Sequence, residues 1–142
     1  MNKLKPFHLA FPVHDLEEAR EFCVNVIGAG TGREDKSWID FDLFGHQIVA
    51  HLKDGMKTGI DITNPVDGHS VPVPHFGVIL AMNDWKAMAE RLQQHSETRW
   101  VIEPTIRFEG KPGEQATFFI LDPSGNALEF KAFADMSSLF AT

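Results

Sequence analysis

Residues 7–28, FHLAFPVHDLEEAREFCVNVIG, decide the fold, because within them the hydrophobic pattern changes from the period of a strand to that of a helix. Apolar residues alternate with other residues up to Val13, as in a strand with one apolar face. Asp15 and Glu18 have the spacing of a capping box, which predicts that a helix begins here. Apolar residues then recur at helical spacing until Gly28, which suits the left-handed conformation that ends a helix. The stretch therefore predicts a strand followed directly by a helix.

Three strand-like segments follow this unit, and the same order of elements returns later in the chain. The three strands expected after the helix cover residues 30–34, 37–43 and 47–52. Residues 53–72 are rich in turn-forming residues and lack sustained periodicity, which predicts a linker. After it we expect a strand over 73–82, a helix capped by Asn83 or Asp84, and strands near 99–108, 115–121 and 126–133. The sequence thus predicts an α+β fold in which two tandem βαβββ modules, residues 5–52 and 73–133, make a single domain over residues 1–142.

The composition argues against nucleic acids and membranes as partners. The 142 residues include 20 acidic and 13 basic ones, for a formal net charge of -7, and no basic cluster is present to attract a phosphate backbone or an anionic membrane. The N-terminal residues lack the pattern of a signal peptide, which predicts a cytoplasmic protein. Cys23 is the only cysteine, so an internal disulfide and a cysteine-based zinc site are excluded.

One titratable residue lies near the middle of the first and the last strand of each expected module. These four residues are His8, His51, His75 and Glu129. Each lies on the strand face that the strongest hydrophobes avoid. A single histidine on a strand is more often a structural residue than a ligand. Two imidazoles and a carboxylate on one face, however, form the facial triad that suits Fe(II), Mn(II), Zn(II) or Ni(II), so the four residues together predict a metal site.

Four segments make the chain similar to the vicinal-oxygen-chelate superfamily, which includes glyoxalases, bleomycin-resistance proteins and extradiol dioxygenases. The segments are PFHL at 6–9, VAHL at 49–52, PHFGV at 74–78 and DPSGNALE at 122–129. The resemblance implies that the two modules form a curved, barrel-like mixed sheet around a divalent metal ion. It implies that His8, His75 and Glu129 bind the metal. His51 falls on a fourth ligand position, where the superfamily normally has Glu or Gln.

Three functions are open at this point. The leading one is an Fe(II) dioxygenase of the extradiol type, in which His51 is a ligand or a nearby acid or base; a bacterial group of small proteins generally labelled as dioxygenases has the same FGHQ and PHFG patterns. Against it, Phe119 stands where the extradiol signature has a tyrosine, and the chain contains no tyrosine. The second is a glyoxalase-like lyase or epimerase-like isomerase, in which Zn²⁺, Ni²⁺ or Mn²⁺ acts as a Lewis acid and His51 or Glu129 moves a proton. The third is a non-catalytic protein that binds an antibiotic, which the retained ligands disfavour.

Three further residues are candidate contacts of a small-molecule substrate: Arg107, Trp38 and Lys131. Arg107 has the planar fork that holds a carboxylate with two hydrogen bonds, although an arginine on the outer face of a strand is commoner. Each open module leaves apolar faces and strand edges that need a partner, so we expect a homodimer. The sequence does not decide whether the modules pair within one chain or across two.

Overall fold

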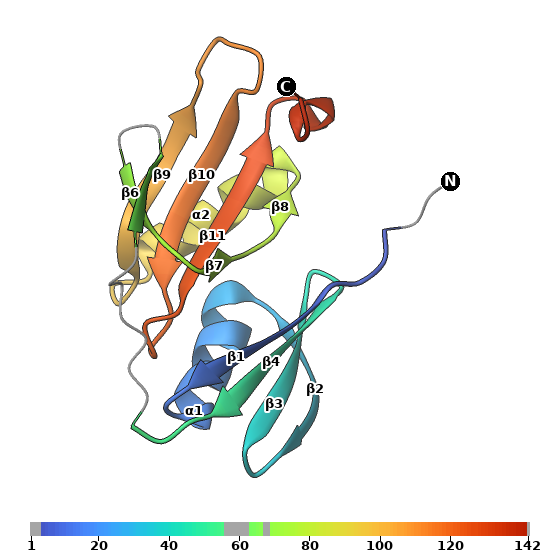
Figure 1. The fold of residues 1–142 in the computed structure, drawn as a ribbon, viewed down its shortest axis with the longest axis vertical. Coiled ribbons are helices and arrows are strands. Elements are labelled where there is room, and N and C mark those ends of the chain that lie inside the picture. Colours follow the sequence, from blue (N-terminus) through green and yellow to red (C-terminus); the bar gives the residue numbers. More distant parts are fainter. Residues whose placement is uncertain (1–3, 56–62, 67–68, 142) are drawn as a thin grey trace. The chain divides into compact units, whose positions relative to one another are not determined.

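The computed structural model describes residues 4–55, 63–66 and 69–141 (Figure 1). The chain divides into two compact units, residues 1–58 and 59–142. Each unit contains a mixed sheet with helical segments, and the βαβββ order recurs in both. The prediction of an α+β fold with two βαβββ modules is therefore confirmed.

The first unit follows the predicted order of elements. Its elements are β1 (His8–Val13), α1 (Leu16–Arg20), the π-helical segment η1 (Glu21–Ile27), β2 (Gly30–Asp35), β3 (Trp38–Leu43) and β4 (His46–Leu52). The strands pair in the order β1-β4-β3-β2, and β1 and β4 are parallel. The first and last strands of the module therefore lie side by side.

The helix of this unit begins and ends where its sequence predicts. The side chain of Asp15 accepts a hydrogen bond of 2.9 Å from the backbone N–H of Glu18. Gly28 ends the helical segment with a φ of 90°, a conformation that costs glycine little. The buried core includes Phe11, Val13, Ile27, Ile39, Phe41 and Ile48. Since α1 packs against β3 and β4, one face of the sheet is covered by the helix.

The expected linker contains a short hairpin. Strands β5 (Thr63–Val66) and β6 (His69–Pro72) pair in antiparallel fashion. Four-residue strands are too short to produce a readable alternation, which is why the sequence pattern indicated only turns. The C-terminal end of β6 supplies Val71, which packs with Ile102 and Phe119 in a small buried cluster.

The second unit has the expected order, with one strand divided in two. Its further elements are β7 (His75–Phe76), β8 (Ile79–Leu80), α2 (Met82–Gln94), β9 (Arg99–Arg107), β10 (Gln115–Leu121), β11 (Ala127–Phe133) and the short 3-10 helix η2 (Met136–Ser138). The order of pairing is β7-β11-β10-β9, and β8 also pairs with β11. Both β7 and β8 run parallel to β11, which repeats the arrangement of β1 and β4.

Two boundaries in this unit differ from the sequence prediction. The strand expected over residues 73–82 is interrupted at Gly77, whose backbone comes against the carbonyl group of Glu129. Helix α2 begins at Met82, before the predicted caps, and its N-cap Ala81 makes no side-chain hydrogen bond. Asp84 lies in the first turn instead, where a carboxylate interacts favourably with the helix dipole.

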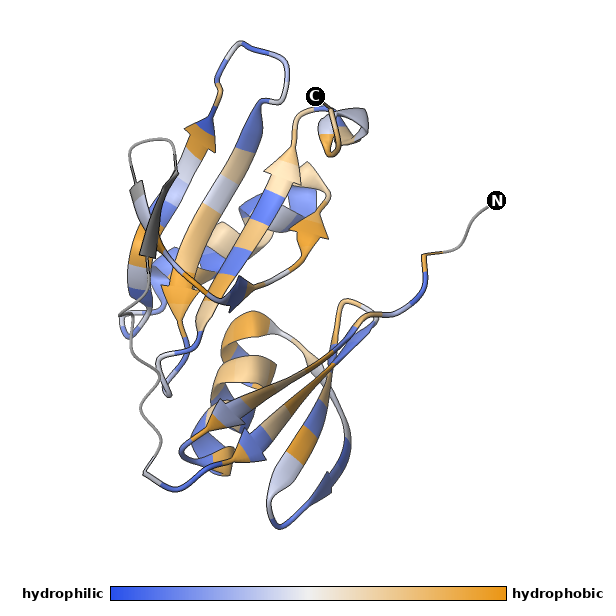
Figure 2. Cartoon of the chain, viewed as in Figure 1, coloured by the Kyte–Doolittle hydropathy of each residue, from blue (hydrophilic) through white to orange (hydrophobic). Residues whose placement is uncertain are grey.

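The two faces of the second sheet differ in character. Trp85 of α2 donates a hydrogen bond of 2.8 Å to the carbonyl oxygen of Phe130, and its ring lies 5.6 Å from that of Phe118. Alternation along the strands turns Glu129 to the face opposite Phe130. Figure 2 shows hydrophilic segments interrupting the otherwise apolar β11. Within the described residues, no helix is long and apolar enough to cross a membrane.

Candidate functional site

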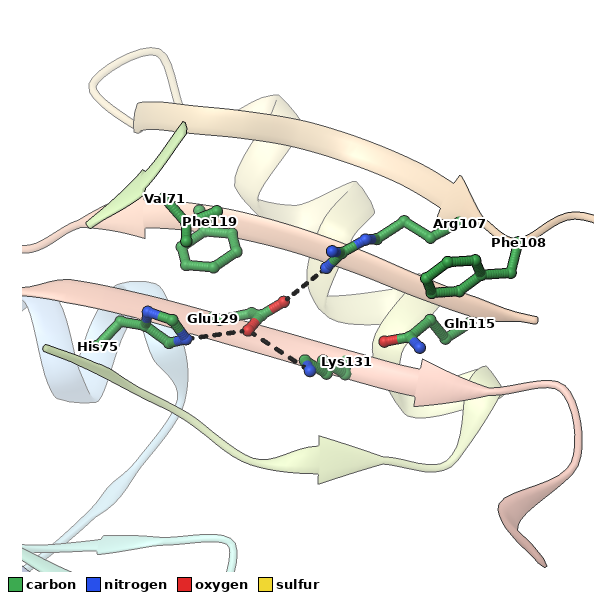
Figure 3. Close-up of a pocket in the computed structure, with 8 residues that line it drawn as sticks. All are labelled: Val71, His75, Arg107, Phe108, Gln115, Phe119, Glu129 and Lys131. Carbon is green, nitrogen blue, oxygen red and sulfur yellow. Dashed lines mark ion pairs between the residues drawn. The ribbon is translucent and has the colours of Figure 1, made fainter. Parts of the chain in front are cut away.

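Strands β10 and β11 place a carboxylate and a cation on the face of the second sheet that is turned away from α2. Glu129 is paired with Phe119, and Lys131 with Thr117. These side chains border a pocket of about 280 Å³ (Figure 3). The residues that line it are Val71, His75, Arg107, Phe108, Gln115, Phe119, Glu129 and Lys131. Three of its walls therefore come from β9, β10 and β11, and His75 completes it from β7.

The Glu129 carboxylate is the centre of this site. Its side chain is only 6% exposed, and one oxygen accepts a 2.5 Å hydrogen bond from the Thr117 hydroxyl. The same oxygen lies 3.7 Å from an Nη of Arg107, and the other lies 3.3 Å from Nε2 of His75 and 3.8 Å from Nζ of Lys131. Burial, the largest single influence, raises the pKa of Glu129, but the contacts with His75 and Thr117 and the nearby positive charges outweigh it and lower the pKa overall. The carboxylate is thus held in its ionised form.

His75 is oriented by a backbone carbonyl. Its Nδ1 lies 2.6 Å from the carbonyl oxygen of Pro72. A carbonyl oxygen only accepts, so Nδ1 carries the proton and Nε2 is directed at Glu129. The hydrogen bond to Glu129 raises the pKa of His75 above its ordinary value, although partial burial opposes this shift. In the absence of a metal, the Glu129 carboxylate therefore favours protonation of Nε2.

Gly77 fixes the distance between the two strands that carry these groups. A Cβ atom at this position would lie 1.5 Å from the carbonyl oxygen of Glu129. Only glycine allows so close an approach. The glycine of the PHFG segment is thus explained by the packing of the strand beside the Glu129 backbone.

The first unit carries a second histidine with a similar tether. His8 and Gln47 are direct partners in the parallel β1–β4 ladder, and His8 Nδ1 lies 2.7 Å from Oε1 of Gln47. Gln47 Nε2 donates to a carboxylate oxygen of Asp40 at 3.3 Å, which directs its amide oxygen toward the histidine. The His8 Nδ1 proton is then donated to Gln47, and Nε2 is left as the atom that can bind a metal.

His51 lies on the same face as Gln47, four residues further along β4. Its partners in the ladder are Pro12 and Trp38. Four residues of strand correspond to about 13 Å. Since a ligand nitrogen lies about 2 Å from its metal ion, this register argues against His51 as a ligand that shares an ion with His8. Gln47 is the direct ladder partner of His8, and a role of His51 at the metal stays a prediction.

The structure therefore brings the predicted residues together in two sets. In the second unit, His75, Glu129, Arg107 and Lys131 surround one pocket. In the first unit, His8, His51 and Trp38 lie along one sheet face, with Gln47 nearest to His8. Among the residues that the structure describes, no three His, Cys, Asp or Glu side chains form a cluster that could hold a metal ion.

The donor atoms nevertheless suit a divalent metal. Two donors bound about 2.1 Å from one ion lie about 3.0 to 3.4 Å apart for the usual octahedral and tetrahedral angles. The 3.3 Å between His75 Nε2 and Glu129 Oε1 falls in this range. Both His8 and His75 have Nδ1 held by an oxygen, the outer contact that is typical of metal-binding histidines.

Sequence reasoning missed three polar residues of these sites: Gln47, Thr117 and Gln115. The signal for Gln47 was present, because it shares a strand face with His51 and the fourth-strand ligand of the superfamily is normally Glu or Gln. Thr117 is a small residue within the apolar run ATFFIL, and nothing in that run indicates that its hydroxyl meets Glu129. Its role became visible only through the register of β10 and β11.

Comparisons with known proteins agree with this architecture. No protein-family model and no curated protein matches the sequence. A glyoxalase/bleomycin resistance protein/dioxygenase from Alicyclobacillus acidocaldarius is 31% identical, with a TM-score of 0.79 and 96% of each chain covered.

Two more distant solved structures share the fold. A glyoxalase/dioxygenase from Nostoc punctiforme is 12% identical, with a TM-score of 0.69 and coverage of 95% of this chain and 99% of that one. The fosfomycin resistance protein FosX from Listeria monocytogenes is 14% identical, with a TM-score of 0.66 and coverage of 98% and 96%. On the 31% identity over nearly the whole of both chains, this protein belongs to the glyoxalase/bleomycin resistance/dioxygenase family, within the vicinal-oxygen-chelate superfamily.

Proposed function

We propose that the protein is a metal-dependent enzyme that acts on a small, oxygen-rich molecule. The observation that carries this proposal is the pair of tethered histidines. Each has Nδ1 bound to an oxygen, and His75 directs Nε2 at a buried carboxylate. The Nε2 atom of His75 therefore lies beside a second oxygen-rich metal donor, the Glu129 carboxylate, at the edge of a pocket that a small molecule can enter.

The residues proposed to hold the ion are His8, His75 and Glu129. The Gln47 side chain holds Nδ1 of His8, so it is not counted as a ligand itself. The three protein ligands would leave further coordination positions of the metal open for substrate. Two histidines and a carboxylate with open positions are typical of non-heme Fe(II) oxygenases. This donor set supports an Fe(II) dioxygenase as the leading reaction. The bound metal would supply Lewis acidity and, as Fe(II), reactivity toward O₂.

A specific observation also favours a second candidate, a lyase or isomerase. The pocket places Phe119 against His75, with the rings 4.8 Å apart and edge-on, so no hydroxyl group stands at this position to exchange a proton. If the Gln47 amide turns from His8 to the metal, four protein ligands result. Chemistry in which the metal only polarises a substrate oxygen then suits the site better. Zn²⁺, Ni²⁺ or Mn²⁺ would serve this reaction.

The protein's own groups have defined parts in either reaction. Thr117 holds one Glu129 oxygen by a hydrogen bond and so directs the other oxygen toward His75. The ring of Phe119 and the side chain of Val71 exclude water from one end of the pocket. Arg107 and Lys131 supply positive charge beside the carboxylate. A substrate oxygen that becomes negative during the reaction would be stabilised by these two cations.

The test is metal analysis of protein purified without chelators, followed by anaerobic reconstitution with Fe(II) and with Zn(II). We expect one ion per chain and a loss of binding in His75→Ala and Glu129→Gln, with Lys86→Gln on the exposed side of α2 as the control. Oxygen uptake with catechols by the Fe(II) form would identify the dioxygenase. Exchange of a substrate proton with deuterated solvent, without oxygen uptake, would identify the isomerase or lyase. Failure of the wild-type protein to retain any divalent metal would refute the proposal.

A further inference from the structure

The pocket of the second unit has an excess of positive charge. Arg107 and Lys131 line it, and Glu129 is the one acidic residue among its lining residues. The chain as a whole carries a formal net charge of -7, so this local excess runs against the composition. A polar sheet face exposed to solvent in an acidic protein would be expected to show the opposite balance.

Glu129 lies near the outer limit of ion-pair distance from both cations. Its oxygens lie 3.7 Å from Arg107 and 3.8 Å from Lys131, beyond the usual length of a charge-assisted hydrogen bond. The shorter contacts of the carboxylate are with Thr117 and His75. Arg107 is only 6% exposed, so little solvent screens its charge from the pocket. A ligand anion in the pocket would therefore be attracted by Arg107 and Lys131 together.

The geometry of the strands points to a planar anion. Arg107 on β9 is the direct partner of Gln115 on β10, and Thr117, the next residue on that face, is the partner of Lys131 on β11. The guanidinium fork, the amide and the ammonium group therefore border the same end of the pocket (Figure 3). A guanidinium fork matches the two oxygens of a carboxylate.

Gln115 adds a requirement for a hydrogen-bond donor. Its Oε1 is buried and has no hydrogen-bond partner among the residues that the structure describes. Its Nε2 faces the carbonyl oxygen of Gly113 at 3.4 Å, which keeps the amide oxygen on the other side. A buried acceptor without a donor is costly, so a ligand hydroxyl group at this place would be stabilising.

Phe108 gives the pocket an apolar wall at a strained position. Its φ is 56°, which is unusual for a bulky residue, and the residue is 44% exposed although it lines the pocket. The Cζ of Arg107 lies 5.9 Å from the centre of this ring. Strain of this kind gathers at ligand sites, where it holds a side chain that contacts the ligand. With Val71 and Phe119, the ring provides contacts for an apolar body.

We propose that this pocket binds a small 2-hydroxycarboxylic acid with an apolar or aromatic body. Its carboxylate pairs with Arg107 and Lys131, and its hydroxyl donates to Gln115. A volume of about 280 Å³ limits the ligand to a small molecule. The inference rests on the proposed function in so far as the pocket is the substrate pocket, and it names the class of substrate.

The experiment is calorimetric titration of the full-length protein, after dialysis against a chelator and again after loading with Zn(II). The probes are mandelate, the uncharged 1-phenylethane-1,2-diol, phenylacetate, which lacks the hydroxyl, and the phosphonate analogue of mandelate. The variants are Arg107→Gln, Lys131→Gln and Gln115→Leu. Lys86→Gln, which removes an exposed positive charge on α2, is the matched control.

Mandelate is expected to bind at least about tenfold more tightly than the diol, and no more weakly than the phosphonate. Arg107→Gln should weaken mandelate about tenfold or more and leave the diol unchanged. In the metal-free protein, Gln115→Leu should abolish the preference for mandelate over phenylacetate. If Arg107→Gln unfolds the protein, the affinities for mandelate and the diol are compared in Arg107→Lys and Lys131→Gln instead. Arg107→Lys keeps the charge but loses the guanidinium fork, and Lys131 is partly exposed.

Two results with the wild-type protein would overturn the inference: no binding of mandelate to the metal-free or the Zn(II)-loaded form, or equal affinities for mandelate and the diol. So would losses of mandelate affinity in the pocket variants that are no larger than in Lys86→Gln. A phosphonate that binds tenfold more tightly than mandelate would also overturn it. The metal titration separates this failure from that of the proposed function. Mandelate binding that depends on Arg107 in a protein that binds no metal would refute only the enzyme proposal. Metal binding without any preference for the carboxylate would refute only the present inference.

Discussion

A single methyl group at Gly77 is expected to damage the site more than any surface substitution. In Gly77→Ala the new Cβ would lie 1.5 Å from the carbonyl oxygen and 2.6 Å from the carbonyl carbon of Glu129, whereas real Cβ atoms essentially never approach closer than 3.0 Å. The strand segment of His75 and strand β11 must therefore move apart by at least 1.5 Å, the difference between 3.0 Å and 1.5 Å. The 3.3 Å separation between His75 Nε2 and Glu129 Oε1 cannot survive such a shift unchanged. Overpacking of this kind costs about 1–3 kcal/mol of stability.

Gly77→Ala is expected to lower both the urea midpoint of unfolding and the affinity for Zn(II), and both can be measured. Displaced ligands and ligand supports typically cost about 10- to 100-fold in metal affinity, and we expect the upper end for Gly77→Ala. Gly30→Ala is the matched control, because the Cβ added there lies 3.5 Å from Asp42 Cβ, an ordinary contact, and Gly30 belongs to strand β2 of the other unit. The reasoning is refuted if Gly77→Ala has the urea midpoint and the Zn(II) affinity of Gly30→Ala.

Three further predictions test the ligand assignment, the pH dependence and the assembly. Gln47→Ala should weaken metal binding about 10- to 100-fold, because it releases the tether on His8, whereas His51→Ala should not; the reverse order, measured by competition with a chromogenic chelator, would restore His51 as the fourth-strand ligand. In the metal-free protein, the raised pKa of His75 contributes stability that is fully present below about pH 6.5 and is lost as the pH rises through the raised pKa. The lowered pKa of Glu129 contributes stability that is fully present above about pH 4.3 and is lost as the pH falls through the lowered pKa. The difference in urea midpoint between wild type and His75→Ala should therefore be largest between these pH values and shrink toward pH 9, and a difference that grows with pH would contradict the ion pair. Light scattering should show a homodimer, and mixing His8→Ala with Glu129→Ala chains should restore activity only if each site takes ligands from both subunits.

Local signals explain why most of the fold could be predicted from the sequence. The Asp15 cap and the Gly28 terminus each depend on residues close together in the chain, and the structure has the corresponding hydrogen bonds. The division of the strand at Gly77 could not be predicted in this way. It depends on the backbone of Glu129, which becomes a neighbour only after β11 has paired.

The candidate site shows the same limit more sharply. Strand alternation assigned His75 and Glu129 to polar faces, and those faces do meet in one pocket. Alternation also put Gln47 and His51 on one face, but it gives no information about which of them stands opposite His8. That depends on the register of β1 and β4, which are separated in the sequence by a helical segment and two strands. A shift of four residues along a strand preserves the face while moving the side chain about 13 Å.

Parallel pairing of the first and last strands of a module explains why its functional residues come in pairs. The ladder sets His8 beside Gln47 in the first unit, and the β7–β11 ladder sets His75 next to the strand of Glu129 in the second. The first module then offers one tethered histidine and the second offers a tethered histidine and a carboxylate, and no three His, Cys, Asp or Glu among the described residues form a group that could hold a metal ion. A catalytic metal in a protein usually takes at least three protein ligands. For the proposed ligands His8, His75 and Glu129 to share one ion, a module that carries His8 and a module that carries His75 and Glu129 would both have to contribute, whether from one chain or from two copies.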